Sequence, residues 1–146
     1  SSDLVVAVEV HVAPDADMFE DLPAYGLFCR HAETLVLDDV HFHLEKPDAR
    51  PAMIFDQVDD LELRASSAAP PSSDEPVVWL RGVRGGLAQA LRAQSGTKTL
   101  FMISGPQTDR LHALANDFTQ AQTAFQVGSE VAKSALRQEA NLLRVL

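Results

Sequence analysis

A four-residue pattern, first seen at Leu27-Phe28-Cys29-Arg30, recurs along the chain and constrains its fold more than any other feature. It returns at residues 53–56, 78–81, 101–104 and 125–128, at intervals of 26, 25, 23 and 24 residues. The first and third positions are apolar in every copy, as in a strand that buries one face. A repeat of this length built on short strands indicates a solenoid. We therefore expect an all-β fold, a right-handed parallel β-helix of about five short rungs with an N-terminal strand.

A second set of segments follows the same period. Leu35-Val36-Leu37 aligns with Leu61-Glu62-Leu63 and, more loosely, with Leu87-Ala88-Gln89 and Arg110-Leu111-His112. Asn116 and Asn141 match at an offset of 25 residues. Residues 66–76 are rich in Ser and Pro, which is typical of a loop, so we expect an excursion between rungs there.

The length of 146 residues and the apolar fraction of 46% predict one domain with a sizeable core. Residues 4–12 alternate valine with other residues, which predicts a strand, and we assign residues 1–21 to an N-terminal strand and cap. Residues 22–128 are the repeated rungs, and residues 129–146 are a last rung or a C-terminal cap. An amphipathic helix starting at Ser129 is the alternative for this last segment, but the register of Asn141 favours a rung.

Charge and composition exclude several classes of function. The net charge of −9 disfavours nucleic-acid binding, which depends on Lys and Arg contacts to phosphates. Residues 1–75 carry 17 acidic against 4 basic residues, whereas residues 76–146 carry 4 against 8, so an anionic ligand should prefer the C-terminal half. No apolar run is long enough to span a membrane. The chain opens without a signal-peptide pattern, which indicates a cytoplasmic protein or a peptide already removed. The single cysteine, Cys29, excludes an internal disulfide, and its column predicts a buried thiol.

At residues 22–31 (Leu-Pro-Ala-Tyr-Gly-Leu-Phe-Cys-Arg-His) and 46–52 (Lys-Pro-Asp-Ala-Arg-Pro-Ala) the sequence resembles the C-terminal rungs of family 28 glycoside hydrolases, the polygalacturonase-like β-helix enzymes. The likeness runs from about Met18 to the C-terminus and implies a pectin-lyase-like fold and a secreted or periplasmic location. That family's catalytic motifs look like Asn-Thr-Asp, Asp-Asp, Gly-His-Gly and Arg-Ile-Lys. Only Asp-Asp occurs, at Asp38-Asp39 and Asp59-Asp60, where rungs turn, so we expect the complete hydrolytic site to be absent.

Polar side chains alternate with apolar ones at Asp39, His41, His43 and Glu45. In a strand they share the outer face, where His41 and His43 with the carboxylates could bind a divalent metal. A solvated strand face explains the same alternation. If the chain is a hydrolase, the candidate catalytic residues are Asp39, His41, His43 and Asp56.

Two outward columns of the first strand set are candidate binding or interface surfaces. Arg30, Asp56 and Arg81 fall in one column, which predicts an ion-pair ladder between rungs or a contact to a sugar. The column before it reads Phe28, Ile54, Trp79, Met102 and Gln126, an apolar stripe that suggests a self-association interface or a sugar-stacking platform.

The sequence thus leaves two hypotheses for function. The first is a small β-helix module, associated with carbohydrate or forming a homo-oligomer through the apolar stripe. The second is a glycan hydrolase or other hydrolase that uses the outer-face Asp and His residues, with or without a metal. The acidic N-terminal half favours a neutral glycan over polygalacturonate, or else a site around Arg81, Arg84 and Arg110.

Overall fold

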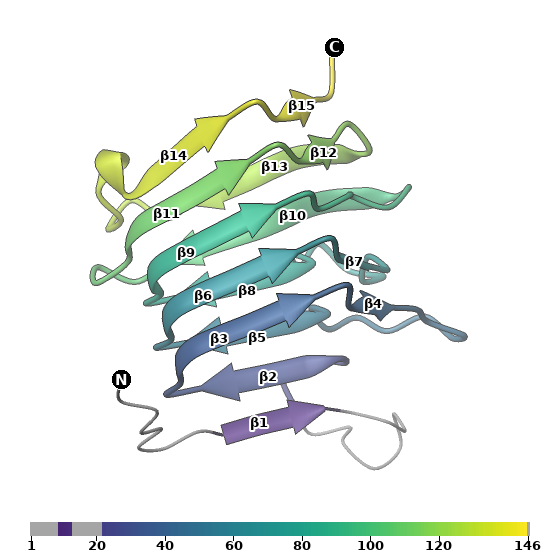
Figure 1. Ribbon diagram of the computed structural model, residues 1–146. Coiled ribbons are helices and arrows are strands. Elements are labelled where there is room, and N and C mark those ends of the chain that lie inside the picture. The colour runs from purple at the N-terminus through teal and green to yellow at the C-terminus, as the bar shows by residue number, and fades with distance from the viewer. Residues whose placement is uncertain (1–8, 13–21, 146) are drawn as a thin grey trace.

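Parallel strands from successive repeats stack into a β-solenoid of about five turns in the computed structural model, which describes residues 9–12 and 22–145 (Figure 1). The repeats follow one another along the stack in chain order, from β2 near one end to β15 at the other. Within these residues the one helical element is a short 3-10 turn at Lys133–Ala135. The all-β solenoid predicted from the repeat is confirmed.

Two large sheets and two short strand pairs form the solenoid. The first sheet has the order β1 (Glu9–Val12), β2 (Leu27–Arg30), β5 (Met53–Asp56), β8 (Val78–Arg81), β10 (Thr97–Ser104), β13 (Ala121–Val127). The second has the order β14 (Leu136–Glu139), β11 (Asp109–Leu114), β9 (Arg84–Gln89), β6 (Asp59–Arg64), β3 (Glu33–Asp38). The short pairs are β4 (His41–Phe42) with β7 (Ser67–Ala68), and β12 (Asp117–Phe118) with β15 (Leu142–Leu143). An isolated bridge from Arg92 to Asp117 continues this third column of strands between the two pairs.

The register predicted for the first sheet is confirmed. Leu27 pairs with Met53, Met53 with Val78, Val78 with Phe101 and Phe101 with Phe125, all in parallel strands. The first four of these side chains are buried in the core between the sheets. Strand β1 adds to the outer edge of β2 in antiparallel orientation, as a cap would, whereas residues 4–8 of the expected N-terminal strand lie outside the described residues.

The register predicted for the second sheet is right at one end and wrong at the other. Leu35 pairs with Leu61 as expected, but Leu61 pairs with Gly86 rather than Leu87. Gly86 in turn pairs with Leu111. The predicted alignment therefore starts one residue too late at Leu87 and one residue too early at Arg110. The reason is that a glycine occupies the inward position of this rung, so no apolar side chain marks it in the sequence. A β-carbon on Gly86 would lie 3.0 Å from Leu111 Cδ2, which shows how little room the core leaves there.

Residues 66–76 and 129–146 also take part in the repeat. Ser67 and Ala68 form β7, so the loop expected over residues 66–76 is wrong for its first residues. At the other end β14 pairs with β11 and β15 with β12, so residues 129–145 form a rung and not an amphipathic helix. Asn116 and Asn141 are stacked as their offset predicts, with Asn116 Nδ2 donating to Asn141 Oδ1 at 2.9 Å.

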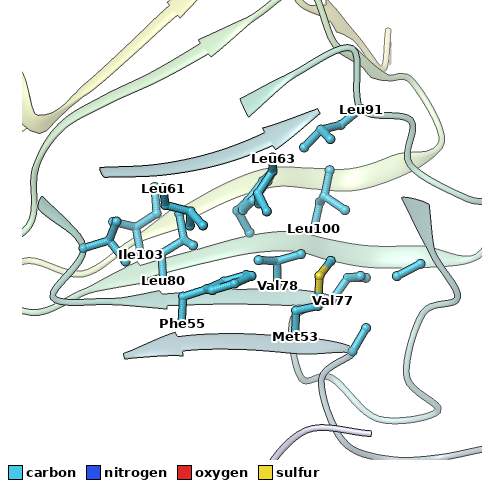
Figure 2. Packing of buried hydrophobic residues seen from close by; sticks show 14 of the residues in the cluster. Met53, Phe55, Leu61, Leu63, Val77, Val78, Leu80, Leu91, Leu100 and Ile103 are labelled. Atoms are coloured by element: carbon cyan, nitrogen blue, oxygen red, sulfur yellow. The ribbon is translucent and has the colours of Figure 1, made fainter. Parts of the chain in front are cut away.

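Apolar side chains from both large sheets fill the space between them and form the core (Figure 2). Phe55, Phe101 and Phe118 are fully buried, and the Phe101 and Phe125 rings stack with centroids 5.3 Å apart. Cys29 is a free, fully buried cysteine, and burial raises the pKa of its thiol. The prediction that the Cys29 thiol is buried in the core is therefore confirmed by its location.

Each rung turns at residues with left-handed backbone conformation, and these residues are themselves stacked. One corner column has positive φ at Thr34, Asp60, Gly85 and Arg110, and another at Asp39, Ala65, Ala90, Ala115 and Ala140. A third, at the first corner of the early rungs, contains His31, Gln57 and Gly82. At these corners the chain turns from one strand of a rung to the next.

Candidate functional site

A polar groove lies along the first corner of the solenoid, where the first sheet turns into the second. It has a volume of about 450 Å³ and crosses four successive rungs, with the lining residues His31, Ala32, Glu33, Gln57, Asp59, Gly82, Arg84 and Gln107. Gln57 and Gly82 have φ values of 55° and 64°, so the chain turns sharply at these positions. The turn sets the two sheets at an angle and leaves the groove between the corner side chains.

The charges in this corner groove are largely neutralised within it. Arg84 donates from Nε to Asp59 Oδ1 and from Nη2 to Asp59 Oδ2, both at 2.9 Å. This bidentate contact raises the pKa of the Arg84 guanidinium above its usual value. Because Asp59 already occupies the Arg84 fork, the groove offers a uronate no free arginine, and Glu33 adds a negative charge.

A shallower depression of about 250 Å³ lies next to the groove on the outer face of the second sheet. It exists partly because residue 85 is glycine, since a β-carbon there would lie 2.7 Å from Asp60 Oδ1. Asp60, Glu62 and Arg110 line the depression. Gly85 has a φ of 80°, a left-handed conformation that glycine adopts readily, whereas Gly86 belongs to the core face of β9.

The predicted ion-pair ladder is present on the outer face of the first sheet. Arg30 Nε lies 3.3 Å and Arg81 Nη2 lies 3.5 Å from Asp56 Oδ2. Asp56 is thus held between two arginines on neighbouring strands, away from the other predicted catalytic residues, which lie beyond the end of β3. The geometry favours the structural role of the ladder over an acid/base role for Asp56.

The apolar stripe is less exposed than expected. Phe28 and Ile54 are buried and form a second small cluster with Ala24, and Trp79 packs against it. The Trp79 indole donates to Ser104 Oγ at 2.9 Å, and the Arg81 guanidinium lies 5.0 Å from its ring centroid. The Arg30 guanidinium lies at the same distance from the Phe28 ring. Trp79 and Met102 are partly exposed, so they form the apolar surface of this stripe that a ligand or partner can contact.

Asp39 and His41 come together, and a serine that the sequence did not suggest joins them. His41 Nε2 lies 2.8 Å from Asp39 Oδ1, and His41 Nδ1 lies 2.8 Å from Ser67 Oγ. Asp39, His41, His43 and Glu45 are all exposed, as the alternation predicts, although β4 spans only His41–Phe42.

The described residues contain no group of three or more His, Cys, Asp or Glu side chains placed to hold a metal ion. Both ring nitrogens of His41 already have partners, Asp39 and Ser67. A metal at His41 and His43 stays an untested prediction.

Ser67, Gln57 and Gln107 are the candidate residues that sequence reasoning missed. The sequence did not predict a place for Ser67 in the site, because Ser67 lies in a Ser- and Pro-rich stretch typical of a loop. One signal was available, since Ser67 follows His41 by 26 residues, the same offset that separates Leu27 from Met53. The two glutamines stand at corners, where no hydrophobic pattern marks the register.

The fold defines the class of this protein as a parallel β-solenoid. Beyond that class, no family model matches the chain, and neither a curated protein nor a solved structure gives a significant match. No helix in the described part of the chain is long and apolar enough to cross a membrane.

Proposed function

We propose that this protein is a small pectin-lyase-like β-solenoid module, related to glycoside hydrolases, that associates with carbohydrate through the corner groove. The groove is the observation that carries the proposal, because it presents Gln57, Gln107, Glu33 and the Asp59–Arg84 pair on successive rungs. Amide, carboxylate and guanidinium groups together donate and accept the hydrogen bonds that sugar hydroxyls need. Rungs repeat every ~4.8 Å, so a linear glycan laid along the stack would meet similar polar groups at each rung.

The relation to glycoside hydrolases rests on the sequence likeness at residues 22–31 and 46–52. Three of that family's four catalytic motifs are absent from this chain. Binding without the family's own hydrolytic reaction is the function that fits both facts. The ligand is a neutral glycan, because Asp59 neutralises Arg84 and Glu33 repels a uronate.

Measuring binding to neutral and acidic oligosaccharides by glycan array and then by calorimetry tests this proposal. We expect Gln107→Ala and Glu33→Ala each to weaken binding of a neutral oligosaccharide about fivefold, the equivalent of one hydrogen bond of ~1 kcal/mol. Gln138→Ala is the matched control, because Gln138 is an exposed glutamine on β14 away from the groove. A protein that binds no glycan, or binds equally well with both groove substitutions, contradicts the proposal.

Self-association is a second candidate, carried by a different observation. Of the exposed large apolar side chains of the described residues, Val36 lies on β3, whereas Val127, Leu142, Leu143 and Val145 lie in the last rung or on β13. We propose that a second copy of the chain covers this end of the stack. The alternative contact is the stripe at Trp79 and Met102, and the dependence of molecular mass on protein concentration separates a monomer from either assembly.

A further inference from the structure

Three side chains beyond the end of β3 form a chain of hydrogen bonds across two rungs. Asp39 stands at the corner with a φ of 60°, His41 opens β4, and Ser67 opens β7. The short strands β4 and β7 are parallel neighbours (Figure 1), and their register pairs His41 with Ser67. The His41 ring bridges the other two residues, at 2.8 Å from Asp39 Oδ1 and 2.8 Å from Ser67 Oγ.

The partners of the imidazole decide which of its nitrogens carries the proton. An ionised Asp39 carboxylate only accepts hydrogen bonds, so in the neutral ring Nε2 holds the proton and donates it to Asp39. Nδ1 is then an acceptor, and the Ser67 hydroxyl donates to it. A carboxylate that fixes the tautomer, a base and a hydroxyl in this order are the parts of an activated serine nucleophile. The two ring nitrogens are exchanged relative to serine proteases, but the roles are the same.

The surrounding backbone holds this constellation in place. Ser67 N donates to Val40 O at 3.2 Å, and Asp39 N donates to Arg64 O at 3.0 Å. The buried Ser66 accepts from Val40 N at 3.0 Å and donates to Arg64 O at 2.7 Å. Both rungs are therefore locked together at this corner, so the Asp39–His41–Ser67 contacts are positioned by a rigid scaffold.

A hydrogen-bond donor also stands beside the serine oxygen. Gln94 Nε2 lies 3.3 Å from Ser67 Oγ, on the rung that follows. In a tetrahedral intermediate, the oxygen that gains negative charge is bonded to the same carbon as Ser67 Oγ. A side-chain amide at this position can donate to that oxygen and stabilise the charge.

We propose that Asp39, His41 and Ser67 form an acyl-transfer site that hydrolyses short-chain acyl esters. Ser67 Oγ forms a bond to the ester carbonyl carbon while its proton passes to His41 Nδ1 and the carbonyl electron pair moves onto oxygen. The ester C–O bond then breaks, and the leaving alkoxide takes the proton from His41. Water repeats the two steps on the acyl-serine and releases the carboxylic acid.

The exposure of the site sets the size of the acyl group. Asp39 and His41 keep 80% and 40% of their side-chain surface exposed, so the site accepts an ester carried on a large molecule. Ser67 lines an apolar cavity, between Met53 and Leu91, and its volume of about 20 Å³ is too small for a long acyl chain. An acetyl ester is therefore the expected substrate class. The site lies at the opposite end of β3 from the corner groove, so it stands or falls independently of glycan binding there.

Labelling with a fluorophosphonate and hydrolysis of p-nitrophenyl acetate test the site directly. We expect one phosphonyl adduct, mapped to Ser67 by peptide mass spectrometry, and ester turnover that falls roughly 10²-fold or more in Ser67→Ala and in His41→Gln. Ser95→Ala is the matched control, since Ser95 is an exposed serine in a turn, and it should keep full activity. Asp39 acts through His41 as a positioning residue, so Asp39→Asn should lower kcat and leave KM unchanged.

Circular dichroism and thermal unfolding of each variant separate loss of chemistry from loss of fold. An adduct at another residue, no adduct at all, or a folded Ser67→Ala variant with unchanged turnover overturns the proposal. In those cases the three side chains serve only to connect two rungs.

Discussion

At the scale of single residues, the corners are the part of the fold that the amino-acid types conceal. Left-handed conformations usually favour glycine or asparagine, yet alanine occupies this conformation at positions 65, 90, 115 and 140. The neighbouring rung holds these residues in place, as when Ala65 N donates to Gln89 O and Ala115 N donates to Glu139 O. No local sequence signal marks such residues, because the stabilising contact comes from about 25 residues further along the chain.

This arrangement predicts that Ala115→Gly stabilises the protein. Glycine removes the penalty of roughly 1–2 kcal/mol for a left-handed alanine, partly offset by the greater entropy of the unfolded chain, so a gain of up to ~1 kcal/mol is expected. Ala113→Gly is the matched control, because Ala113 is buried in β11, where glycine destabilises by roughly 0.5–1 kcal/mol. Urea unfolding measures both. Equal changes in the free energy of unfolding for Ala115→Gly and Ala113→Gly would contradict the backbone strain assigned to position 115.

At the scale of elements, the hydrophobic pattern predicts register only where large apolar residues mark the inward face. The first sheet meets this condition, with Leu27, Met53, Val78 and Phe101 in one buried column, and its register is confirmed. The second sheet does not meet this condition at Gly86, which has no apolar side chain to mark the inward face. Because side chains alternate with a period of two, a register predicted one residue out exchanges the inward and outward faces of β9. For the candidate site, alternation placed Asp39 and His41 on one face, but Ser67 lay in a segment with loop composition.

Asn116 and Asn141 stack on neighbouring rungs as an asparagine ladder. Outside the apolar core, this is the feature whose loss should lower the free energy of unfolding most. Asn116 is buried, its Oδ1 accepts from Leu91 N at 2.8 Å, and its Nδ2 donates to Ala88 O at 2.9 Å. Asn116→Ala leaves these backbone groups without partners in a place that water reaches poorly, at about 1–3 kcal/mol for each group left unpaired. We expect the free energy of unfolding to fall by roughly 2–4 kcal/mol.

Asn141→Ala is the comparison for the ladder, since Asn141 occupies the same column in the last rung and is only half-buried. It donates to Ala113 O at 3.0 Å, so its removal should cost less than removal of Asn116. Chemical unfolding of both variants measures the difference. A larger loss of unfolding free energy in Asn141→Ala than in Asn116→Ala would mean that the asparagine of the last rung contributes more to stability than the buried one.

At the scale of the whole molecule, charge is distributed along the axis of the stack. Residues 22–75 carry 11 acidic and 4 basic residues, whereas residues 76–145 carry 4 acidic and 8 basic residues. Because the rungs follow chain order (Figure 1), one end of the solenoid is negative and the other positive. The outer edge of β3 at the negative end and that of β14 at the positive end are unpaired among the described strands. Two copies stacked head to tail would bring complementary charges and two parallel-strand edges together.

Head-to-tail stacking predicts an assembly that weakens as salt is added, because a Debye length of about 8 Å at physiological ionic strength screens the opposed ends. Sedimentation velocity over a range of protein and salt concentrations should show species that grow beyond dimers, since a heterologous contact does not close on itself. Leu142→Asp, together with Leu143→Asp, places negative charge on the positive end and removes exposed apolar surface, so it should give a monomer. Trp79→Ala is the control for the alternative contact on the first sheet. If that variant is monomeric while the double aspartate variant still associates, the interface lies on the stripe with Met102 and not at the ends of the stack.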